Sequence, residues 1–182
     1  TIMASILKVN TIQDATNSNT AISVDSSGRV FTPARPAFMV GISAMYSHTS
    51  GDTIQYNTTS GTGGFDNGNN FDLSNYKFVV PVDGQYQFHA SFSLQSGERT
   101  RSANCRLAIN GSNIDARYQA RSNLDGTNTG GTSYLNLRGL WLLNLTASQE
   151  ISWKASWETD DNMDSSENLH LHGAYCWGML VG

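Results

Sequence analysis

The chain has few charged residues, few prolines and no long hydrophobic run. Charged side chains make up 14% of its 182 residues, hydrophobic ones make up 38%, and the polar remainder is mostly Ser, Thr, Asn and Gly. No segment places apolar residues at helical spacing over several turns. This composition favours short strands joined by frequent turns over long amphipathic helices.

These absences also disfavour several classes of protein. The net charge is −4, so we expect no nucleic-acid groove. No apolar run approaches the roughly 18 residues that a membrane-spanning helix needs, so we expect no membrane contact. The first residues lack the apolar region of a secretion signal. Without a secretory route, the only two cysteines, Cys105 and Cys176, are expected to be free, buried thiols.

No motif for catalysis is present. The sequence has no Gly-x-Ser-x-Gly turn, no recognisable pairing of Cys with His, and no phosphate-binding glycine loop before a helix. Glycoside hydrolases depend on carboxylates whose separation a sequence does not give. We therefore expect a protein that is not an enzyme and that uses no cofactor.

Two groups of polar residues have the spacing of part of a metal site. His170 and His172 share one face of an expected strand, but no third ligand is spaced to complete a transition-metal site, which favours structural or interface histidines. Asp160, Asn162 and Asp164 alternate as at the start of a calcium loop. The glycine and the distal Glu of such a loop are missing, which favours a solvated acidic loop and leaves calcium open.

The clearest strand pattern lies between residues 71 and 94. Polar and apolar side chains alternate over 85–94, which predicts a strand with one aromatic face buried. The apolar run 78–80 predicts a second strand. Pro-Val-Asp-Gly at 81–84 predicts a tight turn that pairs these two strands, with Gly84 at positive φ.

The rest of the chain from residue 35 also predicts strands. Asn110-Gly111 is a strong signal for a hairpin turn. Residues 134–145 are the most apolar, which predicts a strand buried on both faces or a contact between subunits. Trp153 and Trp157 alternate with polar residues and are expected in the core. The expected strands are 36–40, 52–57, 105–109, 114–120, 151–157 and 169–181, with loops at 60–70, 123–132 and 159–168.

Part of this pattern resembles the signature of the C1q and tumour necrosis factor (TNF) superfamily. The matching residues are Phe71, Phe78, Gly84, Tyr86 and Phe88, and Asp66 fits the family's Asn/Asp position. Two family aromatic positions fall on Ser60 and Ala90. The resemblance covers about 35–182 and implies a ten-stranded jelly roll that forms a homotrimer through its inner aromatic strands. The residues expected in its core or trimer contact are Phe71, Phe78, Gly84, Tyr86, Phe88, Trp141, Tyr175 and Trp177.

Residues 1–34 are expected to form an extended arm outside this domain. Three short apolar segments on a polar string cannot bury a core, so the arm should lie on another surface by β-augmentation or by exchange between subunits. A disordered tail is the alternative. The phrases SILKVNTIQD and AISVDSSGRV are similar to lead-in segments of structural proteins of tailed bacteriophages, especially of cyanobacterial phages. The expected anchoring residues are Ile6, Leu7, Val9, Ile12, Ile22, Val24, Val30 and Phe31.

The strand pattern and the two resemblances together imply an all-β, trimeric C1q/TNF-like jelly-roll head (35–182) on an N-terminal arm (1–34), located in a virion and made in the bacterial host cytoplasm. The first hypothesis is a capsid-decorating (cement) protein whose arm binds the major capsid protein or other virion proteins and stabilises the shell. The alternative is the receptor-binding head of a short tail fibre, with loops 58–70 and 121–132 contacting host surface glycans. A secreted C1q/TNF ligand is disfavoured because no signal peptide or collagen-like repeat is present.

Overall fold

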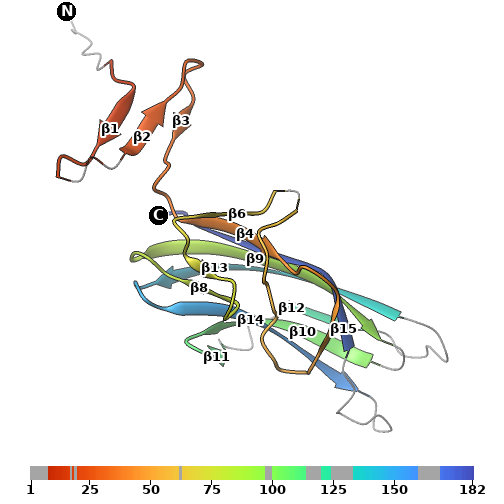
Figure 1. The fold of residues 1–182 in the computed structure, drawn as a ribbon. Helices are drawn as coiled ribbons and strands as arrows, with labels where there is room; N and C mark the ends of the chain where they lie inside the picture. The colour runs from red at the N-terminus through yellow and green to blue at the C-terminus, as the bar shows by residue number, and fades with distance from the viewer. Residues whose placement is uncertain are drawn as a thin grey trace, which may run out of the picture. The chain divides into compact units, whose positions relative to one another are not determined.

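The protein is built from β-strands in three antiparallel sheets (Figure 1). The chain divides into two compact units, Thr1–Arg35 and Pro36–Gly182. No helix long and apolar enough to cross a membrane occurs in the part of the chain that the structure describes. This computed structural model describes residues 8–16, 18, 20–61, 63–96, 100–113, 120–123, 133–159 and 169–182.

The first unit contains a three-stranded sheet in the order β1-β2-β3. The strands pair with one another as a meander, whereas the sequence predicted an extended arm that lies on another surface. The first strand begins after the expected anchoring residues Ile6, Leu7 and Val9. Ile12 is the residue that lies opposite Ile22 on the next strand. Ile6 and Leu7 lie outside the described residues. The strands are β1 (Thr11–Gln13), β2 (Thr20–Val24) and β3 (Val30–Phe31).

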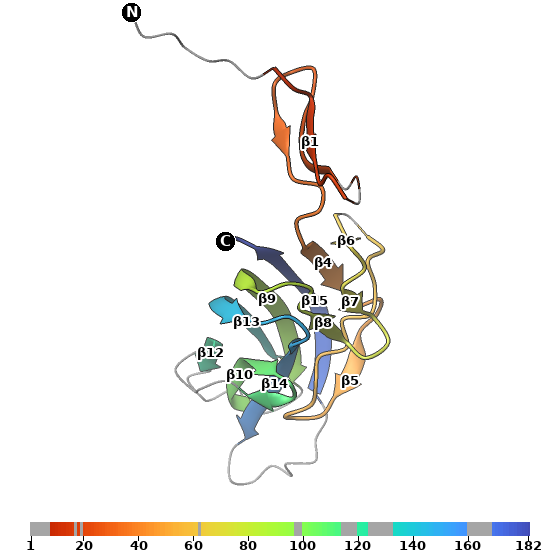
Figure 2. The same ribbon diagram turned by 90° about the vertical axis from the view of Figure 1, so that its left-hand side faces the viewer.

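The second unit is a sandwich of two sheets, stacked as Figures 1 and 2 show. One sheet has the order β13-β9-β15-β4-β6, with β5 also paired to β15; the other has the order β11-β10-β14-β8-β7, with β12 paired to β10. The strands of the first are β4 (Ala37–Gly41), β5 (Tyr46–His48), β6 (Phe65–Asn67), β9 (Gly84–Ser96), β13 (Ser133–Leu145) and β15 (Leu169–Leu180). Those of the second are β7 (Phe71–Asp72), β8 (Lys77–Val79), β10 (Thr100–Ile109), β11 (Ser112–Asn113), β12 (Ala120–Asn123) and β14 (Glu150–Thr159).

Strands β8 and β9 lie in different sheets, so the predicted pairing between them is wrong. After β8 the chain turns away, and Val80 exchanges backbone hydrogen bonds with the turn before β14. Val80 donates to the Gln149 carbonyl (2.9 Å) and accepts from the Ser148 N–H (2.8 Å). Both strands still supply the same core, since the rings of Phe78 and Phe88 lie 5.9 Å apart. Residues 80–83 therefore cross between the layers.

Aromatic rings fill the space between the two sheets. Phe38 stacks on Phe78 at 4.7 Å between ring centroids, and Trp153 meets Phe88 edge-on at 5.8 Å. The two cysteines lie in the same core and are free, as predicted. Burial raises the pKa of both thiols, so neither carries a reactive thiolate near neutral pH. The other buried rings of this core include Tyr56, Phe71, Tyr86, Phe92, Trp141 and Trp157.

Three other expectations can be compared with the structure. The Asn110-Gly111 hairpin is confirmed, with both residues at positive φ and Ile109 opposite Ser112. The predicted strand 52–57 makes only an isolated bridge through Thr53, although its apolar side chains are buried. The predicted loop 60–70 contains β6, whose Asp66 carboxylate accepts hydrogen bonds from the backbone N–H groups of Asn70 and Phe71. Residues 114–119, 124–132 and 160–168 lie outside the described part of the chain.

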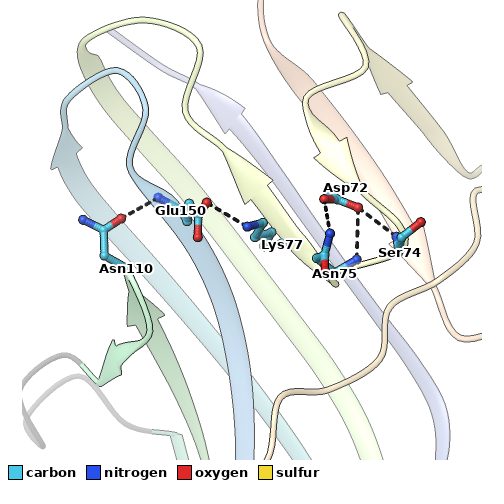
Figure 3. A network of polar contacts seen from close by, with 6 residues as sticks. All are labelled: Asp72, Ser74, Asn75, Lys77, Asn110 and Glu150. Carbon is cyan, nitrogen blue, oxygen red and sulfur yellow. Dashed lines mark hydrogen bonds and ion pairs between the residues drawn. The ribbon is translucent and has the colours of Figure 1, made fainter.

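A polar network ties the β7–β8 turn to β14 and to the β10–β11 hairpin (Figure 3). The Asp72 carboxylate accepts hydrogen bonds from the backbone of Ser74 and Asn75, which closes the turn. Lys77, at the start of β8, forms an ion pair with Glu150, with 2.7 Å between Nζ and the carboxylate oxygen Oε1. The backbone N–H of Glu150 donates to the side-chain oxygen of Asn110 at 2.9 Å. Turn chemistry thus adds polar contacts to this edge of the sandwich, beside the core packing of Phe71 and Phe78.

Gly84 does not adopt the positive φ that the sequence predicted. It begins β9, and a Cβ at this position would lie 2.5 Å from the Leu180 side chain and 2.8 Å from the Gly182 carbonyl oxygen. We therefore expect Gly84→Ala to destabilise the fold by about 1–3 kcal/mol through overpacking. Denaturant unfolding of both proteins measures this cost.

A double-mutant cycle tests the cause. The cost of Gly84→Ala should be smaller in a Leu180→Ala background, where the nearest side-chain contact is gone. An equal cost in both backgrounds would show that the contact with Leu180 is not the reason for glycine here.

Candidate functional site

The sheet β13-β9-β15-β4 has one face on the core and one face turned away from it. Along β9, Tyr86, Phe88 and Ala90 are buried, which turns His89 and its neighbours to the opposite side. We call that side the outer face. Its side chains include Met39 on β4, Gln87, His89, Ser91, Ser93 and Gln95 on β9, Tyr134, Asn136, Arg138, Leu140, Leu142 and Asn144 on β13, and His170, His172, Tyr175, Trp177 and Met179 on β15.

A β-bulge in β15 brings aromatic rings to the outer face. The register of β15 against β9 shifts between His172 and Tyr175, where Gly173 has φ +52°. A regular strand over the predicted range 169–181 would place Leu171, Tyr175 and Trp177 on one face, and the bulge separates them. After the bulge Cys176 enters the core, so Tyr175 and Trp177 face outward.

His89 lies at the centre of this surface. Its ring stacks on Tyr175 and on Trp177, each at 5.5 Å between centroids. In the strand register, Leu140 of β13 and Trp177 of β15 lie on either side of His89, and Met39 of β4 lies opposite Trp177. These residues form a row across four neighbouring strands. The row is a continuous apolar band that lies across the strands.

The band continues onto exposed leucines of β13. Leu140 is 63% exposed and Leu142 is 58% exposed, and Tyr134 on the same side is 53% exposed. The sequence predicted that residues 134–145 are either buried on both faces or in contact with another subunit. The exposed leucines show that the first of these predictions is wrong within a single chain. An edge strand with large apolar side chains in water is typical of an interaction surface.

The charges of the outer face have one sign. Strands β4, β9, β13 and β15 contain no Asp or Glu, so Arg138 and three histidines are the ionisable groups beside the tyrosines. Burial, and secondarily the charge of Arg138, lowers the pKa of His89. The buried Nδ1 of His89 has no hydrogen-bond partner in the described part of the chain. The surface is therefore uncharged at its centre near neutral pH.

The histidine pair on β15 does not form a metal site with the residues that the structure describes. His172 hydrogen-bonds through Nε2 to the Gln95 side chain and meets Tyr134 edge-on at 5.9 Å. His170 is exposed beside it. Within the described ranges no group of three or more His, Cys, Asp or Glu could hold a metal ion, and the acidic loop 160–168 lies outside them.

The structure places the predicted site residues in the core, on the outer face and in the N-terminal unit. Gly84 begins β9, and Tyr175 and Trp177 lie on the outer face. Sequence reasoning did not identify His89, and it included Leu140 and Leu142 only as part of the segment 134–145, in which they alternate with Gly139 and Trp141. Of the core or trimer residues, those buried in the core are Phe71, Phe78, Tyr86, Phe88 and Trp141. Of the arm residues, Val9, Ile12, Val30 and Phe31 are exposed, whereas Ile22 and Val24 are half-buried.

Solved structures share this architecture. No protein family model matches the chain, and no curated protein sequence matches it. The globular domain of zebrafish complement 1qA protein is similar with a TM-score of 0.58 and 16% identity, over 81% of this chain and 98% of that one. Murine APRIL is similar with a TM-score of 0.55 and 10% identity, over 81% and 99%. The fold is a C1q/TNF-like jelly roll. At these identities the likeness concerns the fold of the jelly roll and not its ligands.

The histidines of the jelly roll make its stability depend on pH. Burial lowers the pKa of His48 in β5 as well as that of His89, relative to about 6.5 in an unfolded chain. The unfolded state therefore binds protons more readily. The contribution of these two neutral histidines to the free energy of unfolding should be fully present above pH 6.5. It should fall as the pH decreases towards the pKa values of the folded state.

Urea unfolding between pH 8 and pH 5 measures this dependence. His89→Phe keeps an aromatic ring in the stack and removes the titrating group, so its stability should vary less with pH. His48→Phe should act in the same direction. Parallel stability curves for wild type and both variants would contradict this interpretation.

Proposed function

We propose that residues 36–182 form a non-enzymatic head that assembles as a homotrimer through the outer face. The observation that carries the proposal is the pair of exposed leucines, Leu140 and Leu142, beside the His89–Trp177 stack. Such a band costs free energy while it faces water, and the same face of the two other copies in a trimer covers it. The C1q/TNF-like fold supports this choice, since the family resemblance implies trimers that pack through these inner strands.

Substitution of Leu142 tests the trimer. Its side chain is exposed in the single chain, so Leu142→Lys should leave the fold intact while it places a charge in the contact. We expect wild type to sediment as a trimer and the variant to dissociate at least tenfold more readily. The matched control is Val82→Lys, because Val82 is also exposed but lies outside the four strands.

Two results would contradict the trimer contact. One is a wild-type chain that stays monomeric at tens of micromolar concentration. The other is equal dissociation of Leu142→Lys and Val82→Lys, which would place the contact elsewhere on the head.

We further propose that the trimer is a structural protein of a tailed-phage virion, where it decorates the capsid. The similarity of the lead-in phrases to phage structural proteins supports this role. The first unit supports it too, since Val9 and Phe31 expose apolar surface that a capsid subunit can cover. A ligand that binds only the assembled shell stabilises it by mass action, and three linked units add avidity.

Deletion of residues 1–34 tests the anchoring role. The truncated head should remain a trimer, and its binding to capsids that lack the protein should fall by at least tenfold. Full-length protein is the control, and antibody labelling of intact particles locates the wild type. Labelling at the tail only, with adsorption of the isolated head to host cells, would replace capsid decoration by the tail-fibre alternative.

A further inference from the structure

The N-terminal sheet has two chemically different faces. Ile12 lies opposite Ile22, and Val24 lies opposite Val30. Ile22 and Val24 are two residues apart on the central strand, so all four side chains project to the same side. We call this set (Ile12, Ile22, Val24 and Val30) the aliphatic face.

The other side of the sheet carries polar and charged groups. Ser23 lies opposite both Thr11 and Phe31. The Arg29 guanidinium lies 6.0 Å from the centre of the Phe31 ring, and its Nε contacts the Asp25 carboxylate at 2.6 Å. The sheet is therefore amphipathic, with its cation on the side away from the aliphatic face.

The first unit does not cover the aliphatic face by itself. Val30 is 65% exposed and Ile12 is 46% exposed. Units below about 40 residues usually need disulfides, a metal or oligomerisation to hold a fold. Residues 1–35 contain no cysteine, and the described part of the chain contains no cluster that could hold a metal. Of these three supports, oligomerisation is the one that the aliphatic face can provide.

We propose that the aliphatic face packs against the same face of the two other copies, as a three-sided bundle of sheets that extends the trimer. The inference rests on the proposed trimer of the head. Only residues 32–36 separate β3 from β4, and they span at most about 18 Å. They contain Pro33 and Pro36 and a turn in which the Arg35 N–H donates to the Thr32 carbonyl (3.0 Å).

This short connection favours copies of the same chain as the occupant. A trimeric head holds three aliphatic faces at an effective concentration in the millimolar range, before any other protein arrives. The three faces are identical and uncharged, so their approach brings no like charges together. Association would leave Phe31 and Val9 available for the capsid contact of the proposed function.

Cysteine cross-linking of the full chain tests the arrangement. Ile22 is on the central strand, so three-fold packing of the sheets brings the three Ile22 positions closest to the axis. We expect Ile22→Cys to give covalent dimers with a short bis-maleimide, leaving one subunit of each trimer unlinked. Ser23→Cys is the matched control, since the next residue on the same half-buried strand points to the other face. Cys105 and Cys176 are fully buried and should not react.

The outcomes separate this inference from the function on which it rests. Sedimentation of each variant without the linker reports the head trimer. A trimer whose Ile22→Cys and Val24→Cys forms both fail to cross-link, or whose Ser23→Cys form cross-links equally well, would overturn the bundle and leave the head proposal standing. A monomer in sedimentation would overturn both.

Discussion

The packing of Phe88 between the two sheets is the interaction on which the rest of the head depends. Its ring contacts Phe78 and Trp153 from the opposite sheet and Phe38 from its own. Strand β9 is held between β13 and β15, so an inward Phe88 fixes the register of all three strands. His89 must then point outward. The core and the outer face are two consequences of one alternation, and a slip of one residue would exchange them.

Much of this fold could be predicted from sequence, because apolar and polar side chains alternate along a strand that has one buried face. The pattern over residues 85–94 identified both the strand and its buried face, and Asn110-Gly111 identified a turn whose chemistry is local. Strand partners could not be predicted in the same way. Residues 78–80 and 85–94 are close in sequence, yet they do not pair with each other. Phe78 lies opposite Ile151 and residues 85–94 lie opposite 135–144, since burying Phe78 and Phe88 against each other requires opposite layers.

The candidate surface was harder to predict for a related reason. Leu140 and Leu142 have the composition of a buried segment, and they are exposed because their side chains lie on the outer face of the sheet. The bulge at Gly173 likewise separates Tyr175 and Trp177 from Leu171, with which a regular strand would place them on one face. A single extra residue in a strand reverses the direction of every later side chain, and periodicity alone does not show where it occurs.

In the described part of the chain each unit has an amphipathic sheet with exposed apolar side chains, and the proposed trimer would cover both. On the head, Leu142 and the His89 stack form an apolar band without carboxylates. On the N-terminal sheet, Ile12 and Val30 are equally free of charge. Association at either place lowers the entropic cost of association at the other, because the connection between them is short. Charged Arg29 and Asp25 then remain on the outside of the N-terminal sheet, where they oppose non-specific aggregation and leave Phe31 as the apolar group that a different protein can bind.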